Sequence, residues 1–139
     1  MVTQVQYPIR QASILFAIFC LVYFVELASF PLSIDEELAA FRTDAAGWVA
    51  QGRWGANLFE ALIMPQPILP FITPAIFGVG CVVSYLLVMD MIGQRELSLR
   101  EYGCFVVFCG FPTWFFIVEF YSNIAGVGLA LMLMTFALW

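Results

Sequence analysis

Four long apolar runs are the feature that most constrains how this chain folds. They occupy residues 13–30, 69–92, 103–120 and 124–139. Each is close to the roughly 20 residues that a helix needs to cross about 30 Å of hydrocarbon. The chain is 63% hydrophobic and 11% charged, whereas soluble domains are about 45–50% apolar and about 25% charged. The sequence therefore predicts an all-α, polytopic integral membrane protein, a single membrane domain over residues 1–139 with about four transmembrane helices.

The charged residues and cysteines exclude several classes of function. The chain has no histidine and a formal net charge of −5, whereas a nucleic-acid-binding surface is basic. The four cysteines lie inside apolar runs, without the spacing of metal ligands or of a disulfide framework: Cys20, Cys81, Cys104 and Cys109. They are interpreted as small packing residues. We therefore predict no nucleic-acid partner and no zinc chemistry.

Arginines outside the apolar runs predict the orientation in the membrane. Residues 1–12 and 93–102 together hold three arginines, and the loop at residues 31–66 holds two among five acids. By the positive-inside rule, this bias predicts a cytoplasmic N-terminus and a first loop on the periplasmic side. The first run has no convincing cleavage site, so it is interpreted as an uncleaved helix and not as a signal peptide. The short connection at residues 93–102 predicts that the second and third helices are antiparallel neighbours.

The loop at residues 31–66 is predicted to contain a short amphipathic helix over about residues 34–51. Ser33 offers a capping hydroxyl, and the three acids that follow it at residues 35–37 fit the first turn of a helix. Apolar side chains then recur every three or four positions: Ile34, Leu38, Phe41, Ala45, Trp48 and Val49. We expect this helix to lie on or against the membrane surface and to end within residues 52–55.

Three consecutive carboxylates, Asp35, Glu36 and Glu37, are the first candidates for chemistry. Adjacent helical residues point about 100° apart, so one or two of the three can face the same pocket. A carboxylate near hydrocarbon and beside another carboxylate has a raised pKa, which suits proton abstraction from a hydroxyl near neutral pH. The alternative interpretation is an acidic first turn of a helix in water.

Two further carboxylates lie in apolar surroundings, Glu26 near the end of the first run and Glu119 at the end of the third. By the predicted orientation both lie near the periplasmic face, where Arg42 and Arg53 are their natural partners. These residues form either structural ion pairs or a polar, substrate-binding cleft. Arg53 also suits a lipid phosphate, because a guanidinium forms a fork that matches phosphate oxygens. Acid pairs can hold magnesium or manganese, but no metal-ligand spacing indicates such a site.

Glycines and prolines within the apolar runs predict where helices pack closely and where they bend. Gly-Val-Gly occurs at residues 78–80 and again at 126–128. No strand precedes either repeat, so close packing of helices is favoured over phosphate binding. Four prolines within residues 65–74 predict a kinked or extended lead into the second helix, and Pro112 predicts a kink in the third.

Most of the chain resembles the serotype-conversion type of membrane glucosyltransferase, which glucosylates the O-antigen of bacterial lipopolysaccharide and belongs to the GT-C superfamily. The resemblance rests on three stretches: SIDEELAAFRTDAAGWVAQGRWG at residues 33–55, PQPILPFITP at 65–74 and FFIVEFYSN at 115–123. It covers only the N-terminal part of such an enzyme. The last residues, LMLMTFALW, are still apolar, which also leads us to expect the N-terminal part of a larger protein. The alternative is a fourth helix that ends at an interfacial Trp.

The resemblance implies a multi-pass enzyme of the bacterial inner membrane. Such an enzyme takes a sugar, typically glucose, from a polyprenyl phosphate donor and passes it to a hydroxyl of a surface polysaccharide on the periplasmic side. In that family an acidic pair of the first outer loop is considered catalytic, and by position it corresponds to Asp35 and Glu36, one of them acting as the base. Glu37 departs from a simple pair and leaves the assignment open by one residue. We predict no cofactor; a divalent metal is compatible with the acids but is not indicated by their spacing.

Two other classes of function fit parts of the sequence. A count of four spans at this length also fits a small flippase or accessory subunit for the same lipid-linked sugar. A scaffold protein without chemistry is the third hypothesis, in which Glu26 and Glu119 contribute to stability alone.

Overall fold

The structure of the protein is a computed structural model that describes residues 9–29, 49–50, 52–63, 71–118 and 121–139. Within these ranges the regular elements are helices and no strand occurs, which confirms the all-α prediction. The helices are α1 (Ile9–Val22), α2 (Phe24–Ser29), α5 (Trp54–Ile63), α6 (Ile72–Met91), α7 (Leu99–Cys109), α8 (Pro112–Val118) and α9 (Tyr121–Leu138).

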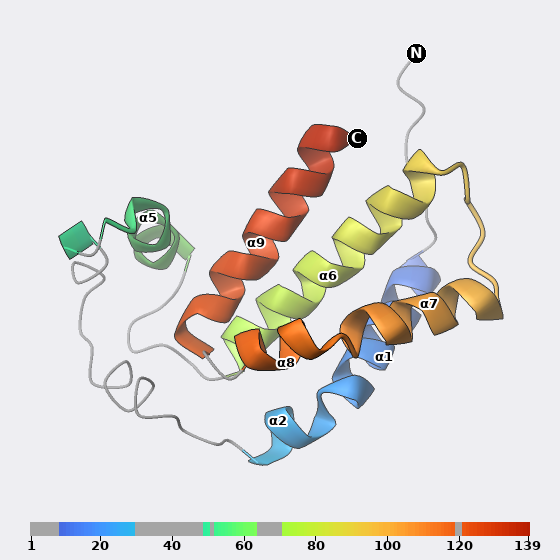
Figure 1. Cartoon of the computed structure of the whole chain (residues 1–139), viewed down its shortest axis with the longest axis horizontal. Helices are drawn as coiled ribbons and strands as arrows, with labels where there is room; N and C mark the ends of the chain where they lie inside the picture. The colour runs from blue at the N-terminus through green and yellow to red at the C-terminus, as the bar shows by residue number, and fades with distance from the viewer. Residues whose placement is uncertain (1–8, 30–48, 51, 64–70, 119–120) are drawn as a thin grey trace.

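Helices α6 and α9 run side by side in the same direction (Figure 1). Gly80 of α6 faces Gly128 of α9. Ten residues further along α6, Asp90 Oδ2 accepts a hydrogen bond of 2.8 Å from Trp139 Nε1 at the end of α9. Both pairs have nearly the same separation in sequence, so the two helices stay in parallel register over about three turns.

The connection at residues 93–98 reverses the chain, and α7 and α8 run antiparallel to α6. Tyr85, near the end of α6, donates a hydrogen bond of 2.6 Å to the carbonyl oxygen of Glu101 at the start of α7. Phe77, near the start of α6, lies 5.7 Å from Trp114 of α8, measured between ring centroids. This is the antiparallel arrangement that the short connection predicts.

An aromatic cluster joins α1, α6, α7 and α8. Phe19 and Tyr23 lie 5.8 and 6.5 Å from Phe77, with the rings edge to face. Trp114 lies between Phe77 and Phe108, 5.7 and 5.6 Å from their centroids. Rings at these separations prefer tilted or edge-on geometry, which adds about 0.5–1.5 kcal/mol per pair to the burial of their area. The core of the described part of the chain is therefore formed around α6 by α1, α7 and α8, and it also includes the fully buried Ile124 of α9.

Pro112 begins α8 after a break at Gly110 and Phe111, and α7 and α8 are bent by 55° relative to each other. Proline has no backbone N–H and its ring would clash with the preceding turn, whereas it is well tolerated at the first position of a new helix. The predicted kink in the third apolar run is confirmed.

The described residues confirm only part of the predicted set of membrane-crossing helices. Within the described ranges, α6 is long and apolar enough to cross a bilayer, and α7 with α8 forms a second span if the bent pair counts as one. The predicted run at residues 13–30 is divided at Tyr23 into α1 and α2. The structure thus supports one such helix, or two with the bent pair, and the arrangement of four spans stays a prediction.

The loop between α2 and α6 contains a helix that the sequence pattern did not predict. Most of the expected amphipathic helix at 34–51 lies outside the described residues, but Val49 and Ala50 are helical and Gly52 follows with φ 74°. A positive φ is accessible to glycine at little cost, so the helix ends there as expected. The expectation that Trp54 and Gly55 belong to this end is wrong, because both lie in the first turn of α5.

Candidate functional site

The predicted site residues divide into two groups. The sequence-based site has four acids and two arginines. Four of these six residues lie outside the described part of the chain, as does the alternative acid Glu37: Asp35, Glu36, Arg42 and Glu119. Glu26 and Arg53 are placed by the structure. The geometry of the proposed acidic pair therefore stays a prediction, and the described site is built from the helices that flank the loop.

Glu26 lies in the first turn of α2 and is half-buried. The preceding break between α1 and α2 is held by Tyr23, whose buried hydroxyl donates a hydrogen bond of 2.7 Å to the carbonyl oxygen of Cys109. Cys109 is the last residue of α7, where carbonyl groups lack a partner within the helix. This contact fixes the start of α2, and with it the backbone that carries Glu26.

Arg53 precedes α5 and lies at the edge of a groove between α5 and α9. This α5–α9 groove has a volume of about 480 Å³ and is lined by Arg53, Gly55, Phe59, Gly126, Val127, Leu129, Ala130 and Leu133. Arg53 is exposed, and it is the one charged side chain among these lining residues. A cation thus meets a surface that is otherwise apolar.

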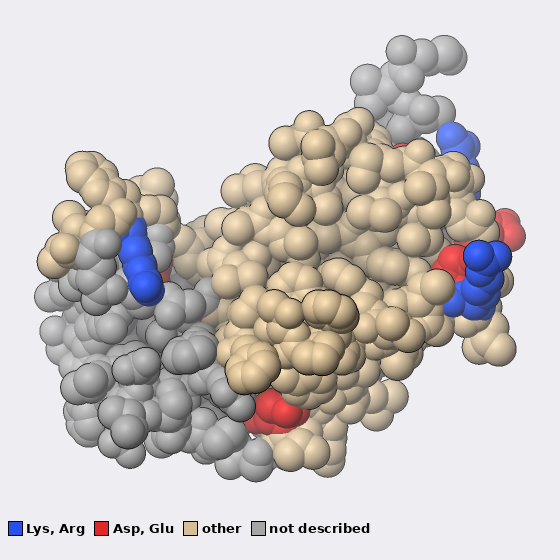
Figure 2. All heavy atoms as spheres, in the orientation of Figure 1, with Lys and Arg blue, Asp and Glu red and all other residues tan. Residues whose placement is uncertain are grey.

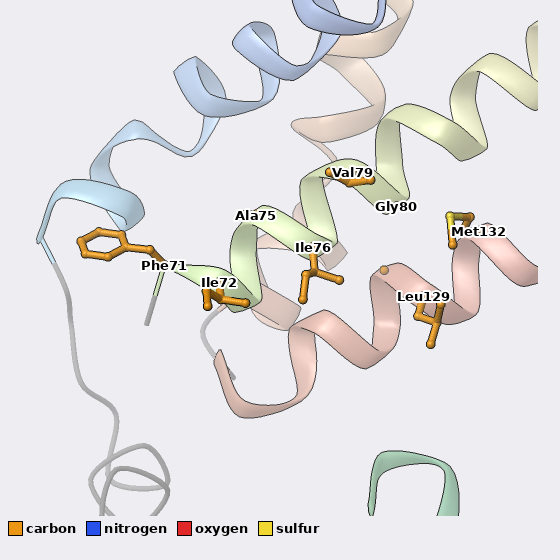
Figure 3. Close-up of a pocket in the computed structure, with 9 residues that line it drawn as sticks. Phe71, Ile72, Ala75, Ile76, Val79, Gly80, Leu129 and Met132 are labelled. Atoms are coloured by element: carbon orange, nitrogen blue, oxygen red, sulfur yellow. The ribbon is translucent and has the colours of Figure 1, made fainter. Parts of the chain in front are cut away.

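A second groove lies on the other side of α9 (Figure 3). This α6–α9 groove has a volume of about 330 Å³ and is lined by Phe71, Ile72, Ala75, Ile76, Val79, Gly80, Gly128, Leu129 and Met132. In Figure 3, Ile76 extends from α6 toward α9. Leu129 lines both grooves, so they lie next to each other across α9.

Glycines allow the helices around these grooves to approach closely. A β-carbon on Gly128 would lie 2.6 Å from the Cα of Phe77, and one on Gly80 would lie 2.3 Å from the carbonyl oxygen of Gly128. Contacts this short are possible only without side chains. The prediction that the Gly-Val-Gly repeats serve helix packing is confirmed for these two glycines.

Sequence analysis did not select Glu60 as a site residue, although it lies in α5 and is only 3% exposed. The neighbouring Phe59 packs against Ala125 of α9 and against the start of α6. The signal was available in the sequence, because Glu60 is a lone carboxylate in an apolar segment, as Glu26 is. Buried carboxylates are costly and are usually held by a partner, so Glu60 marks the inner face of α5.

Charged groups of the described residues are sparse on the face of the molecule that Figure 2 shows. Figure 2 shows the face over α6, α8 and α9 as a continuous surface without charged atoms, with blue and red groups at its ends. No group of three or more histidine, cysteine, aspartate or glutamate side chains in the described part of the chain could hold a metal ion. The described part of the site therefore consists of the cation of Arg53 beside an otherwise apolar groove.

The sequence of this chain matches the model of one protein family. The family model described as "Glucosyl transferase GtrII" matches residues 24–139. No match was found among curated proteins or among solved structures. The matched region begins at the first residue of α2 and includes both grooves and the whole loop between α2 and α6.

Proposed function

The chain belongs to the glucosyl transferase GtrII family, and on this premise we propose that it acts in the transfer of glucose from a polyprenyl phosphate donor to a hydroxyl of a surface polysaccharide. Family membership implies glucosyl transfer in general. The lipid-linked donor, the polysaccharide acceptor, a place in the bacterial inner membrane and a periplasmic active face are the parts that we propose. The membrane is supported by the composition of the chain and by the length of α6.

The position of Arg53 at the edge of the α5–α9 groove is the observation that carries the proposal. A polyprenyl phosphate has an anionic head and a long hydrocarbon tail. The guanidinium of Arg53 can donate two parallel hydrogen bonds to phosphate oxygens. The rest of the groove is lined by apolar side chains and glycines, which suit the first isoprene units of the tail.

The proposed reaction needs one base and one clamp for the leaving group. Asp35 or Glu36 takes the proton from the acceptor hydroxyl, and the hydroxyl oxygen attacks the anomeric carbon of the glucosyl unit. The bond between that carbon and the phosphate oxygen breaks, and the polyprenyl phosphate leaves with the bonding electrons. Arg53 stabilises the negative charge that develops on the phosphate.

Glu26, Arg42 and Glu119 are proposed to line the same substrate-binding region. Carboxylates accept hydrogen bonds from sugar hydroxyls, and Arg42 offers a second cation for the phosphate. Glu26 lies in the first turn of α2, within the region that the family model matches.

The test is sugar transfer from a polyprenyl phosphate glucose donor by the full-length protein. We expect Asp35→Asn or Glu36→Gln to lower kcat by about 10²–10⁴-fold, which is the usual contribution of a general base. Glu96→Gln, in the connection between α6 and α7, is the matched control and should keep the wild-type rate. If the double variant Asp35→Asn with Glu36→Gln is folded and transfers glucose at the wild-type rate, the assigned base is wrong. Translocation of the lipid-linked sugar without release of polyprenyl phosphate would instead indicate the flippase.

A further inference from the structure

Helix α5 carries a stripe of large apolar side chains that the protein leaves uncovered. Trp54, Leu58 and Leu62 are 72%, 60% and 74% exposed. They are spaced four residues apart, so they share one face of the helix. The opposite face is buried at Phe59, which packs against α9 and α6, and at Glu60, which is 3% exposed, whereas Ile63 at the end of this face is 57% exposed. This helix therefore has an inner face that binds the protein and an apolar outer face.

The direction of α5 restricts what can cover this stripe. In Figure 1, α5 is seen nearly end-on, whereas α6 and α9 lie along the plane of the picture, so α5 runs transverse to both. With 10 residues, α5 is about 15 Å long and cannot cross about 30 Å of hydrocarbon. If α6 crosses the bilayer, α5 lies along the bilayer plane.

The contacts of α5 also set its depth. Phe59 packs with Ile72 and Ile76 of α6 and with Ala125 and Leu129 of α9. Ile72 is the first residue of α6, and Ile76 is one turn further along, which corresponds to about 6 Å of helix. α5 thus lies beside the first turns of α6, near the end at which the membrane-crossing helix begins.

The residue types at the start of α5 are those that favour the boundary between hydrocarbon and water. Trp54 is of the residue type that favours the boundary between hydrocarbon and water. The exposed Arg53 directly before it carries the charge that complements anionic lipid phosphates. An apolar stripe with a tryptophan and an arginine at its beginning is typical of a helix that lies in a membrane interface.

From these observations we infer that α5 is an interfacial helix whose Trp54–Leu58–Leu62 stripe inserts into the lipid surface on the side where α6 begins. This arrangement holds the edge of the α5–α9 groove at the depth of the lipid headgroups. The inference goes beyond glucosyl transfer, because a protein without transferase activity can insert the same stripe.

Fluorescence quenching in a bilayer tests the inference. The full-length protein and its Trp54→Phe variant are reconstituted in nanodiscs of phosphatidylethanolamine and phosphatidylglycerol, and the difference between their emissions is the contribution of Trp54. An interfacial helix lies about 5–10 Å into the headgroup boundary. We therefore expect lipids with a nitroxide near the headgroup end of the acyl chain to quench this contribution about twofold more than lipids with the nitroxide near the methyl end.

Trp114 supplies the matched comparison, because it packs between Phe77 and Phe108. Its contribution, taken from Trp114→Phe, should respond less to the shallow nitroxide than that of Trp54. The inference is overturned if the two contributions respond equally. It is also overturned if aqueous iodide, and not the lipid label, quenches Trp54, or if neither does, since the stripe is then covered by water or by protein. Glucosyl transfer is measured separately, so failure of one proposal leaves the other testable.

Discussion

Gly80 and Gly128 bring the backbones of α6 and α9 into direct contact. A β-carbon on Gly80 would lie 2.3 Å from the carbonyl oxygen of Gly128 and 2.7 Å from its Cα. Both are backbone atoms, which cannot move aside as the end of a flexible side chain can. Both glycines also line the α6–α9 groove.

We expect Gly80→Ala to destabilise the protein by about 1–3 kcal/mol, because the helices must separate to admit the methyl group. The thermal unfolding midpoint of the purified protein in detergent measures the effect. Gly126→Ala is the matched control from the second repeat, since nothing lies within 4 Å of the corresponding β-carbon. Equal midpoints for the two variants would contradict the assigned role of Gly80.

Tyr23→Phe should also destabilise the protein. It leaves the buried carbonyl oxygen of Cys109, at the end of α7, without the hydrogen bond of 2.7 Å that Tyr23 donates. An unsatisfied buried acceptor costs about 1–3 kcal/mol. Tyr85→Phe is the control, because Tyr85 donates to the carbonyl of Glu101, which lies inside α7 and retains a helical partner. The thermal unfolding midpoint distinguishes the two variants. If Tyr85→Phe lowers the midpoint more than Tyr23→Phe does, the larger stabilising role assigned to Tyr23 is wrong.

The sequence was sufficient for the features that depend on local chemistry. The apolar runs predict α6, Pro112 predicts the bend between α7 and α8, and the Gly-Val-Gly repeats predict close packing. Each is marked in the sequence by residue types within a single short segment. The second apolar run was predicted to end at residue 92, before the charged connection at residues 93–102. Helix α6 ends at Met91, close to that position.

The features that sequence analysis missed depend on contacts between distant segments. The break between α1 and α2 lies at Tyr23, whose hydroxyl donates a hydrogen bond to Cys109, 86 residues away, and no local signal marks it. α5 was not predicted because Gly52, Trp54 and Gly55 resemble a loop, whereas Phe59 stabilises the helix by packing on α6 and α9. Of the candidate site, Arg53 could be predicted as a charged residue, but the groove beside it forms only when α5 and α9 meet.

The capping box at the start of α7 predicts an acid-dependent loss of stability. The carboxylate of Glu101 accepts hydrogen bonds from the hydroxyl and from the backbone N–H of Ser98, and these bonds lower its pKa below the ordinary value of 4.5. A pKa that is lower in the folded than in the unfolded protein adds stability above the unfolded pKa, and this stability is lost as the pH falls through the folded pKa.

We therefore expect the unfolding midpoint of the wild type to fall more between pH 6 and about pH 3 than that of Glu101→Gln, which has no such carboxylate to protonate. Ser98→Ala should remove much of the same pH dependence, because it removes the side-chain donor. Glu96→Gln lies in the same connection outside the capping box and is the control. Parallel pH profiles for the wild type and Glu101→Gln would exclude the linkage.

Filling the α5–α9 groove should weaken binding of a long-chain donor. Ala130 is an exposed lining residue of this groove, so Ala130→Phe places a ring where the proposed tail lies. We expect the KM for a long polyprenyl phosphate glucose to rise about tenfold, while a donor with a short prenyl chain is affected less. Ala137→Phe, near the end of α9 and outside the groove, is the control. If Ala130→Phe changes the KM for both donors equally, the tail does not occupy this groove.

Arg53 should act on the donor phosphate and not on the stability of the fold. Arg53→Gln removes the charge, and hydrogen bonds to charged groups contribute about 1.5–3 kcal/mol, so the donor KM should rise by about 10- to 100-fold. Arg53→Lys keeps the charge but loses the fork of parallel donors, so its KM should lie between the two. Arg100→Gln, in the first turn of α7, removes an arginine far from the groove and should leave the donor KM unchanged.

Rates are measured over a range of donor concentrations at fixed ionic strength, because added salt screens exposed charges. A donor KM for Arg53→Gln equal to that for Arg100→Gln would show that Arg53 does not contact the phosphate, and the proposed placement of the donor in the α5–α9 groove would have to be abandoned.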